Sequence, residues 1–170
     1  MNEHDDLGLA LNALRRIIRA LRLSSTVTEK TLGVSGAQLF VLHQLEAGAP
    51  LDGVGFSIAE LAQRTSTDPS SVSVVVRRLV ARKLAARRTS AVDGRRAEVV
   101  ITAAGRALLR KAPRPVQEVL IEALEALPKA ELTVTVRSLE SVVRSMGLEK
   151  HDATMFFEPE TDQRRRKKNG

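Results

Sequence analysis

Residues 70–78 consist of three serines, four valines and two arginines, in the order SSVSVVVRR. If this stretch is helical, one face is apolar and consists of Val72, Val76, Leu79 and Val80, with Val75 at the edge of this stripe. The side chains that point the other way are Ser70, Ser71, Ser73, Val74, Arg77 and Arg78. Serine can hydrogen-bond to phosphates or base edges, valine can contact a thymine methyl group, and arginine can bind guanine or phosphate. This second face therefore has the chemistry to enter a DNA major groove.

A second group of arginines follows in the chain. Residues 85–89 and the β-branched run 99–101 predict two strands, with a turn over residues 90–96. The arginines of this predicted hairpin are Arg87, Arg88, Arg95 and Arg96. A hairpin is narrow enough to reach a minor groove, where the negative potential favours arginine. We therefore expect these four side chains to contact DNA from a basic wing.

The positive charge of the chain is concentrated in the same segment. The formal net charge of the 170 residues is +7, and residues 57–101 contain nine Lys and Arg against four Asp and Glu, a net +5. A basic surface indicates a polyanionic partner. Aromatic residues make up only 2% of the chain, so it lacks the stacking platforms that single strands and RNA loops require, and duplex DNA is the better partner. The basic run 164–168 keeps an alternative open, a protein that coats DNA without sequence preference.

Two short helices must position the serine and arginine face. Ser57 can cap the first helix, and Glu60 three residues later can complete a capping box. That helix stops at residues 65–67, which satisfy their own backbone groups locally. Asp68 followed by Pro69 starts a second helix, which we expect to run to about residue 84. Helices joined by so short a turn cross at a large angle, as in a helix-turn-helix.

Apolar stripes at both ends of the chain predict further helices, over 7–32 and about 129–146. The stripe residues are Leu7, Leu11, Leu14, Ile18 and Leu21 in the first and Leu132, Val136, Leu139, Val143 and Met146 in the last. From geometry alone, such a stripe can be buried either on its own domain or on a partner subunit. Arg15, Arg16 and Arg19 lie off the first stripe; solvent exposure is the simpler interpretation, and binding of an anionic effector is the alternative.

The remaining segments connect these parts. Ser35 caps a helix that ends at Gly48, and residues 55–56 could add a third strand to the wing. Thr102 caps a helix that prolines at 113 and 115 must break, and Pro128 marks the next boundary. Residues 1–6 are predicted to be a disordered N-terminus and 148–170 a flexible basic tail.

The order of these features resembles the multiple antibiotic resistance regulator (MarR) family of winged helix-turn-helix proteins. The resemblance rests on the capped first helix, the DPSSVSVVVRRL recognition helix, the Asp-x-Arg wing tip at Asp93 to Arg95, and ITAAGRALL opening a long helix. It covers about residues 7–147. Lys83 stands where family members often place a glycine, so the recognition helix could end slightly differently here.

The resemblance implies a mainly α fold with a small β-wing, in which 35–102 form the winged helix-turn-helix and 7–32 and 103–147 form a helical dimerisation body. It also implies a bacterial, homodimeric transcriptional regulator, usually a repressor, that binds a pseudo-palindromic operator and is often released by a small aromatic or anionic ligand. In the family the wing-tip aspartate braces the wing and its arginine reaches the minor groove, which corresponds to Asp93 and Arg95. We expect Ser35, Ser57 and Thr65 to contact the DNA backbone.

Other classes of protein find little support in the sequence. The absence of Cys removes thiolate chemistry, and the three histidines have no ligand spacing, so we expect no metal and no cofactor. His43 is most simply a hydrogen-bonded or partly exposed residue. No constellation of nucleophile and base exists, so we expect no enzyme. No apolar run reaches about 18 residues and no signal segment is present, which predicts a cytoplasmic, nucleoid-associated protein that does not bind membranes.

Overall fold

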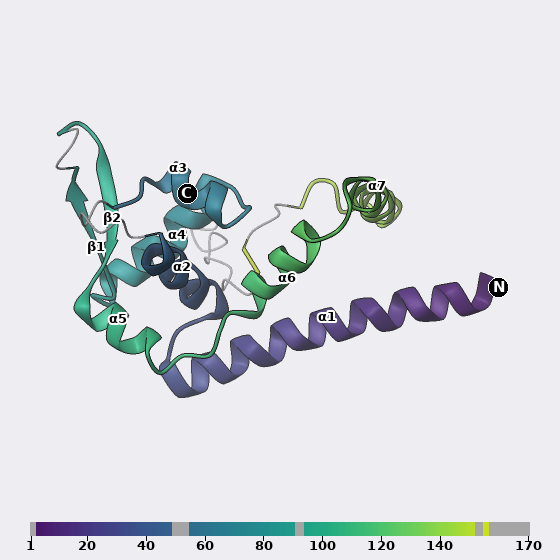
Figure 1. Cartoon of the computed structure of the whole chain (residues 1–170), viewed down its shortest axis with the longest axis horizontal. Helices are drawn as coiled ribbons and strands as arrows, with labels where there is room; N and C mark the ends of the chain where they lie inside the picture. Colours follow the sequence, from purple (N-terminus) through teal and green to yellow (C-terminus); the bar gives the residue numbers. More distant parts are fainter. Residues whose placement is uncertain (1–2, 49–54, 91–93, 152–154, 157–170) are drawn as a thin grey trace, which may run out of the picture.

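The computed structural model describes residues 3–48, 55–90, 94–151 and 155–156. Its elements, in chain order, are α1 (Glu3–Leu32), α2 (Gly36–Ala47), α3 (Ile58–Arg64), α4 (Pro69–Ala81), β1 (Ala85–Thr89), β2 (Ala97–Ile101), α5 (Ala103–Leu109), α6 (Val116–Glu125) and α7 (Lys129–Ser145). Figure 1 shows α2 to α5 and the two strands gathered into one region, from which α1 and α7 extend. The predicted fold class, mainly α with a small β-wing, is confirmed.

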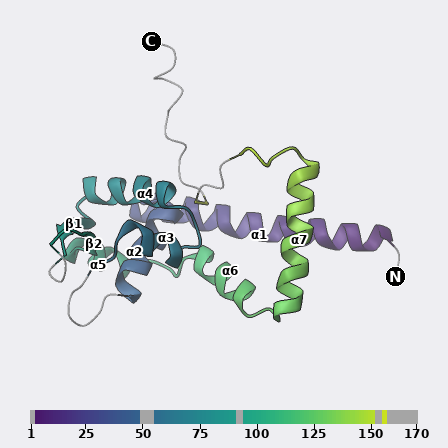
Figure 2. The ribbon, with the colours of Figure 1, turned by 90° about the horizontal axis from the view of Figure 1, so that it is seen from above.

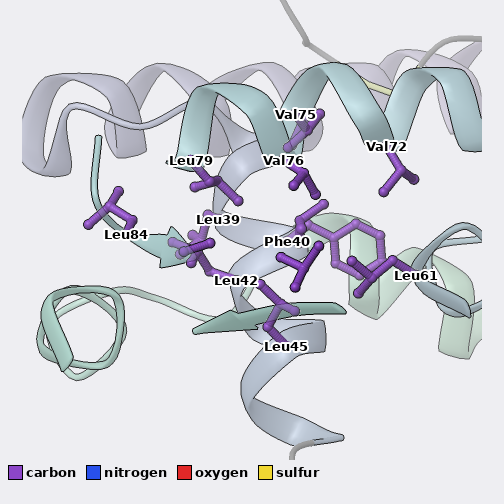
Figure 3. Close-up of a cluster of buried hydrophobic side chains, with 14 of the residues drawn as sticks. Leu39, Phe40, Leu42, Leu45, Leu61, Val72, Val75, Val76, Leu79 and Leu84 are labelled. Atoms are coloured by element: carbon purple, nitrogen blue, oxygen red, sulfur yellow. The ribbon is translucent and has the colours of Figure 1, made fainter. Parts of the chain in front are cut away.

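Helix α2 lies at the centre of the core. Eight of its 12 residues are buried, because it is apolar around most of its circumference and other elements pack on every side. Phe40 and Leu39 of α2 are almost inaccessible, as is Leu61 of α3. Side chains of α4 and α3 point toward Phe40 (Figure 3). This core fixes the positions of α3 and α4 relative to each other.

The strands form a two-stranded antiparallel sheet, as predicted. Ala85 pairs with Ile101 at one end of the ladder and Thr89 with Ala97 at the other. Phe56 adds an isolated bridge, because its N–H and C=O both bond to Val99, at 3.0 and 2.7 Å. The expected third strand therefore exists as a single bridge, and it joins the wing to the start of the helix-turn-helix.

The long helix α1 divides into two halves. Its C-terminal half packs on the rest of the chain, and Leu21 and Thr28 are buried there. Its N-terminal half extends away from α2 to α5 (Figures 1 and 2), and the same stripe is exposed there, with Leu7 at 61% and Leu11 at 41%. The helix begins at Glu3, so the predicted disordered N-terminus 1–6 is wrong for its last four residues.

The C-terminal helices follow the proline pattern. Helix α5 ends at Leu109 and α6 begins after Pro115, so the predicted break is confirmed. Helix α7 begins after Pro128, lies wholly within the described residues, and has no buried residue. The chain then turns at Gly147, whose φ is +67°.

The segment after α7 differs from its prediction. Met155 belongs to the core cluster and is only 5% exposed, and the Gln117 side chain donates to the Phe156 carbonyl at 2.8 Å. Burial of a long apolar side chain against a packed surface is favourable, because it removes apolar area from water. The flexible tail therefore cannot begin at residue 148, and its basic run 164–168 lies outside the described residues.

Candidate nucleic-acid interface

Local hydrogen bonds place the two helices of the helix-turn-helix as the sequence predicts. The Ser57 side chain accepts from the Glu60 N–H at 3.2 Å, and the Glu60 carboxylate accepts from the Ser57 N–H at 2.7 Å, which completes the capping box. Asp68 caps α4, with Pro69 at its first position. Between the helices, Ser66 adopts a left-handed φ of 51°, and its N–H and that of Thr67 bond back into α3. The turn is therefore tight and internally bonded.

The two faces of α4 separate almost as predicted. Its core residues Val72, Val75, Val76 and Leu79 are fully buried, so Val75 belongs to the core stripe and not to its edge. Helix α4 ends at Ala81, about one turn earlier than expected. On the other face Ser70 and Arg77 are exposed, and Ser73, Val74 and Arg78 are half-buried. A rigid apolar stripe thus supports a polar and basic outer face.

Ser71 does not belong to that outer face. It is 8% exposed, and its hydroxyl donates to Asp68 Oδ2 at 2.6 Å while its N–H donates to Oδ1 at 2.9 Å. Ser70 also donates its hydroxyl to Asp68. These bonds from Ser70 and Ser71 lower the pKa of Asp68 well below its usual range. The prediction that Ser71 points away from the core is wrong, because this residue takes part in the N-terminal cap.

The three residues predicted to contact the DNA backbone also serve the fold. Ser35 is buried and forms a capping box with Gln38. Thr65 is buried, and its hydroxyl donates to the carbonyl of Leu61 at 2.8 Å. Ser57 caps α3 and donates its hydroxyl to Glu60 at 2.7 Å. Contact of these three residues with the DNA backbone stays a prediction.

The wing arginines lie on the surface, and two of them have acidic neighbours. Arg88 Nη2 lies 3.5 Å from the buried Glu98 carboxylate, and Arg96 Nη2 lies 3.1 Å from Glu60 Oε1. Arg87 and Arg95 are also exposed. Asp93 lies outside the described residues, so its bracing of the wing stays a prediction.

Glu98 is a wing residue that the sequence prediction missed. Its carboxylate accepts from the Gly55 N–H at 3.0 Å, and hydrogen bonds from the Ser90 hydroxyl and from Gly55 lower its pKa. A Cβ at residue 55 would lie 2.7 Å from the carbonyl oxygen of Val99, so glycine is needed for this approach. The Gly55 partner lies far from Glu98 in the sequence, 43 residues earlier, so no local pattern indicated it.

A small cavity lies between the helical elements. Its lining residues are Leu21, Ser24, Ser25, Gly36, Leu39, Pro115, Val116 and Gln117, from α1, α2 and the start of α6. Its volume is about 10 Å³, which is space for about one water molecule. Gln117 Oε1 is buried without a hydrogen-bond partner in the part of the chain that the structure describes.

Metal and membrane sites find no support in the described ranges. They contain no group of three or more His, Asp or Glu side chains that could hold a metal ion. His43 lies on α2, its Nε2 is buried without a partner among the described residues, and burial lowers its pKa. None of the described helices combines the length and apolarity that crossing a bilayer requires.

Fold and surface together define a winged helix-turn-helix protein of the DNA-binding class. A model described as "MarR family" matches residues 32–96. The chain is 31% identical over 147 residues to the "HTH-type transcriptional repressor Rv2887" of Mycobacterium tuberculosis, covering 83% of this chain and 99% of that protein. The fold is also that of BldR from Sulfolobus solfataricus (TM-score 0.53, 21% identity, 85% of this chain and 99% of that chain) and of apo MarR from E. coli (TM-score 0.51, 22% identity, 78% and 95%).

The chain belongs to the MarR family. It is therefore a DNA-binding transcriptional regulator and not an enzyme.

Proposed function

We propose that the protein is a homodimeric repressor that binds a pseudo-palindromic operator, with α4 in the major groove and the wing in the minor groove. The observation that carries this proposal is the outer face of α4. Arg77 is exposed beside Ser73 and Val74, while the opposite face is fully buried in the core. A recognition surface of this kind can read base edges because its backbone is held rigidly. The nearby wing adds Arg87 and Arg95 for phosphate or minor-groove contact.

The dimer is proposed from two exposed apolar faces. Helix α7 has no buried residue and exposes Val136 and Leu139 of its stripe at 51% and 47%, and the N-terminal half of α1 exposes Leu7 and Leu11. Soluble proteins rarely leave apolar stripes of this length uncovered. A second copy of the chain carries the same two faces, and a twofold axis would allow α1 and α7 to cover each other. The two α4 helices would then reach major grooves about one DNA turn apart, about 34 Å.

Release by a small aromatic or anionic ligand is the finer part of the proposal. The cavity between α1, α2 and α6 offers an apolar wall with the hydroxyls of Ser24 and Ser25 and the amide of Gln117. It is too small for such a ligand as it stands, so binding would have to separate α6 from α1 and α2. A movement of this kind would change the position of the winged segment relative to the dimer.

The proposal is tested by selecting double-stranded DNA from a genomic library with the full chain at physiological salt and sequencing the bound fragments. A compact pseudo-palindrome is the predicted result. Recovery of unselected DNA would instead favour the protein that coats DNA without sequence preference, and would overturn the repressor proposal. An Arg77→Ala variant carried through the same selection serves as the matched control, because it should lose information at one position in each half-site.

A further inference from the structure

Two connections meet at the C-terminal end of the recognition helix. Helix α4 ends at Ala81, and Arg82, Lys83 and Leu84 follow it. Lys83 adopts a left-handed φ of 59°, its N–H bonds to the Val80 carbonyl at 2.9 Å, and the Leu84 N–H bonds to the Leu79 carbonyl at 3.0 Å. This is the Schellman arrangement that usually employs glycine. The direction of the chain after α4 is therefore fixed. The residues on either side of Lys83, which are Arg82 and Leu84, can form hydrogen bonds with other segments of the chain.

The first connection joins α4 to α1. The guanidinium of Arg82 donates a hydrogen bond to the carbonyl of Gly33, 49 residues earlier in the chain. Gly33 ends α1, with φ +69° and its N–H bonded to the Glu29 carbonyl at 2.9 Å. A Cβ on Gly33 would lie 3.2 Å from Arg82 Nη2, so the guanidinium sits directly against this backbone. A cation at the negative end of a helix dipole is favourable, which adds to the hydrogen bond.

The second connection joins α4 to α5, which leads on to α6 and α7. The Thr102 hydroxyl is shared between the carbonyls of Lys83 and Leu84, at 2.7 and 3.0 Å, and the Thr102 N–H bonds to Leu84 at 3.1 Å. The same hydroxyl accepts from the Gly105 N–H at 3.1 Å as the cap of α5. A Cβ at residue 105 would lie only 2.3 Å from the Leu84 carbonyl oxygen. This side of the junction is close-packed backbone.

The two connections differ in what they can control. Thr102 and Gly105 build the covalent path into α5, so their loss would disturb folding itself. Arg82 is an exposed side chain, and its bond to Gly33 spans two elements that are far apart in the sequence. It joins the end of the recognition helix to the helix that carries one of the two exposed apolar faces. Its loss would leave the core packing of α4 within the winged segment unchanged, but would allow that segment to rotate as a unit relative to α1.

Small rotations at this junction have large effects at the DNA surface. Helix α4 has 13 residues, which corresponds to a length of about 20 Å. A tilt of about 10° at the C-terminal end would move the N-terminal end by about 3.4 Å, which is roughly the rise of one base pair. The outer-face residues Ser70, Ser73 and Val74 lie in the N-terminal half of α4, and Arg77 lies just past its middle. The angle between α1 and α4 therefore sets where the reading surface of each protomer lies.

We infer that Arg82 is a positioning residue that fixes this angle and so determines the half-site separation that the dimer accepts. The inference rests on the proposed function, since it assumes a dimer that reads two half-sites. Arg82 makes no base contact in this account. Loss of Arg82 should therefore change the half-site separation that the dimer prefers, and leave the bases read within each half-site unchanged.

The experiment measures the affinity of the full chain for synthetic duplexes built from the palindrome recovered with the wild type. The separation of the half-sites is kept, shortened by one base pair or lengthened by one base pair. The variants are Arg82→Ala, Arg82→Lys, and Arg110→Ala as a charge-matched control on an exposed residue at the end of α5. Gly33→Asn tests the contact from the other side, because asparagine tolerates a left-handed φ while its Cβ, 3.2 Å from Arg82 Nη2, would press against the guanidinium.

Arg82→Ala and Gly33→Asn should both reduce the preference for the native separation at least threefold, with the base preference within a half-site unchanged. Arg82→Lys should retain most of the preference, since an ammonium group can also donate to the Gly33 carbonyl. Arg110→Ala should match the wild type. A wild-type spacing profile in folded Arg82→Ala or Gly33→Asn protein would overturn the inference. Failure of the wild type to select any palindrome would instead overturn the proposed function, so the two failures are distinguishable.

Discussion

Arg96 of the wing and Glu60 of the first helix-turn-helix helix form an ion pair, with Arg96 Nη2 3.1 Å from Glu60 Oε1. Both side chains are about half exposed, at 54% and 44%. Glu60 also accepts hydrogen bonds from Ser57, which are the main cause of its lowered pKa. One carboxylate thus caps α3 and holds a wing arginine that we expect to contact DNA. Binding of a phosphate to Arg96 would have to displace this pair.

Glu60→Gln should therefore bind operator DNA more tightly. Glutamine can retain the capping box, while the competing ion pair and one negative charge near the DNA are lost. Exposed ion pairs contribute about 0.2 to 1 kcal/mol, which corresponds to a gain in affinity of about 1.4-fold to fivefold. Fluorescence anisotropy over a salt series measures this gain, and thermal unfolding checks that the cap survives. Weaker binding by a variant of unchanged stability would show that Arg96 does not contact DNA.

Arg77→Ala should weaken operator binding by about 1 to 3 kcal/mol and relax preference at one position in each half-site. Arg77 is exposed on α4, so its truncation removes a base contact without disturbing the core. Competition binding with single-base operator variants provides the measurement. An unaltered base preference at every position would exclude a reading role for this arginine.

Asp68 should make stability depend on pH through the cap of α4. Its pKa is lowered, so the folded state favours the carboxylate; the stabilisation is present above the ordinary pKa of about 3.9 and is lost as pH falls through the lower folded-state value. Asp68→Ala should lower the free energy of unfolding by about 1 kcal/mol at neutral pH. The difference from wild type should narrow as pH falls below about 3.9, because the unfolded chain then binds a proton that the folded carboxylate does not.

Urea unfolding at several pH values measures both quantities for the Asp68 variants. Asp68→Asn is the matched control, because an asparagine cap accepts the same backbone bonds and carries no titrating group. A difference between wild type and Asp68→Ala that stays constant over the whole pH range would contradict the role of the carboxylate.

Two truncations should separate the buried part of the C-terminal segment from its basic end. Removing residues 148–170 deletes Met155, whose burial in the core should make the product less stable by about 1 to 2 kcal/mol. Removing only residues 157–170 keeps Met155 and the bond between Gln117 and Phe156, so stability should match the full chain. This shorter deletion removes five basic residues and should lower affinity for nonspecific DNA. Equal stability of both products would show that Met155 contributes nothing to the fold.

Features fixed by neighbouring residues could be predicted from the sequence. The cap at Ser35, the capping box at Ser57, the Asp-Pro start of α4 and the helix break before Pro115 depend on residues within one turn of each other. The apolar stripe of α4 also followed from its periodicity, since a helix must bury the face that repeats at 3.6 residues.

Features fixed by partners far away in the chain could not be predicted. The burial of Met155, the bond from Arg82 to Gly33 and the contacts of Glu98 each join segments that only the folded chain brings together. Ser71 is a different case. The helical periodicity predicted an outward side chain, but in the structure its hydroxyl bonds to Asp68 in the N-terminal cap of α4. Lys83 takes the left-handed conformation without being glycine, so composition alone misplaced the end of α4.

The central claim is that two copies of this chain read one specific site. The most direct test measures the affinity of the full chain for the selected operator and for random DNA of equal length, at the same physiological salt, together with the number of chains bound per duplex. A dimeric, sequence-specific regulator should give a ratio of about 10³ or above, with two chains on each operator. A ratio near one would contradict this claim and identify a protein that coats DNA without regard to sequence.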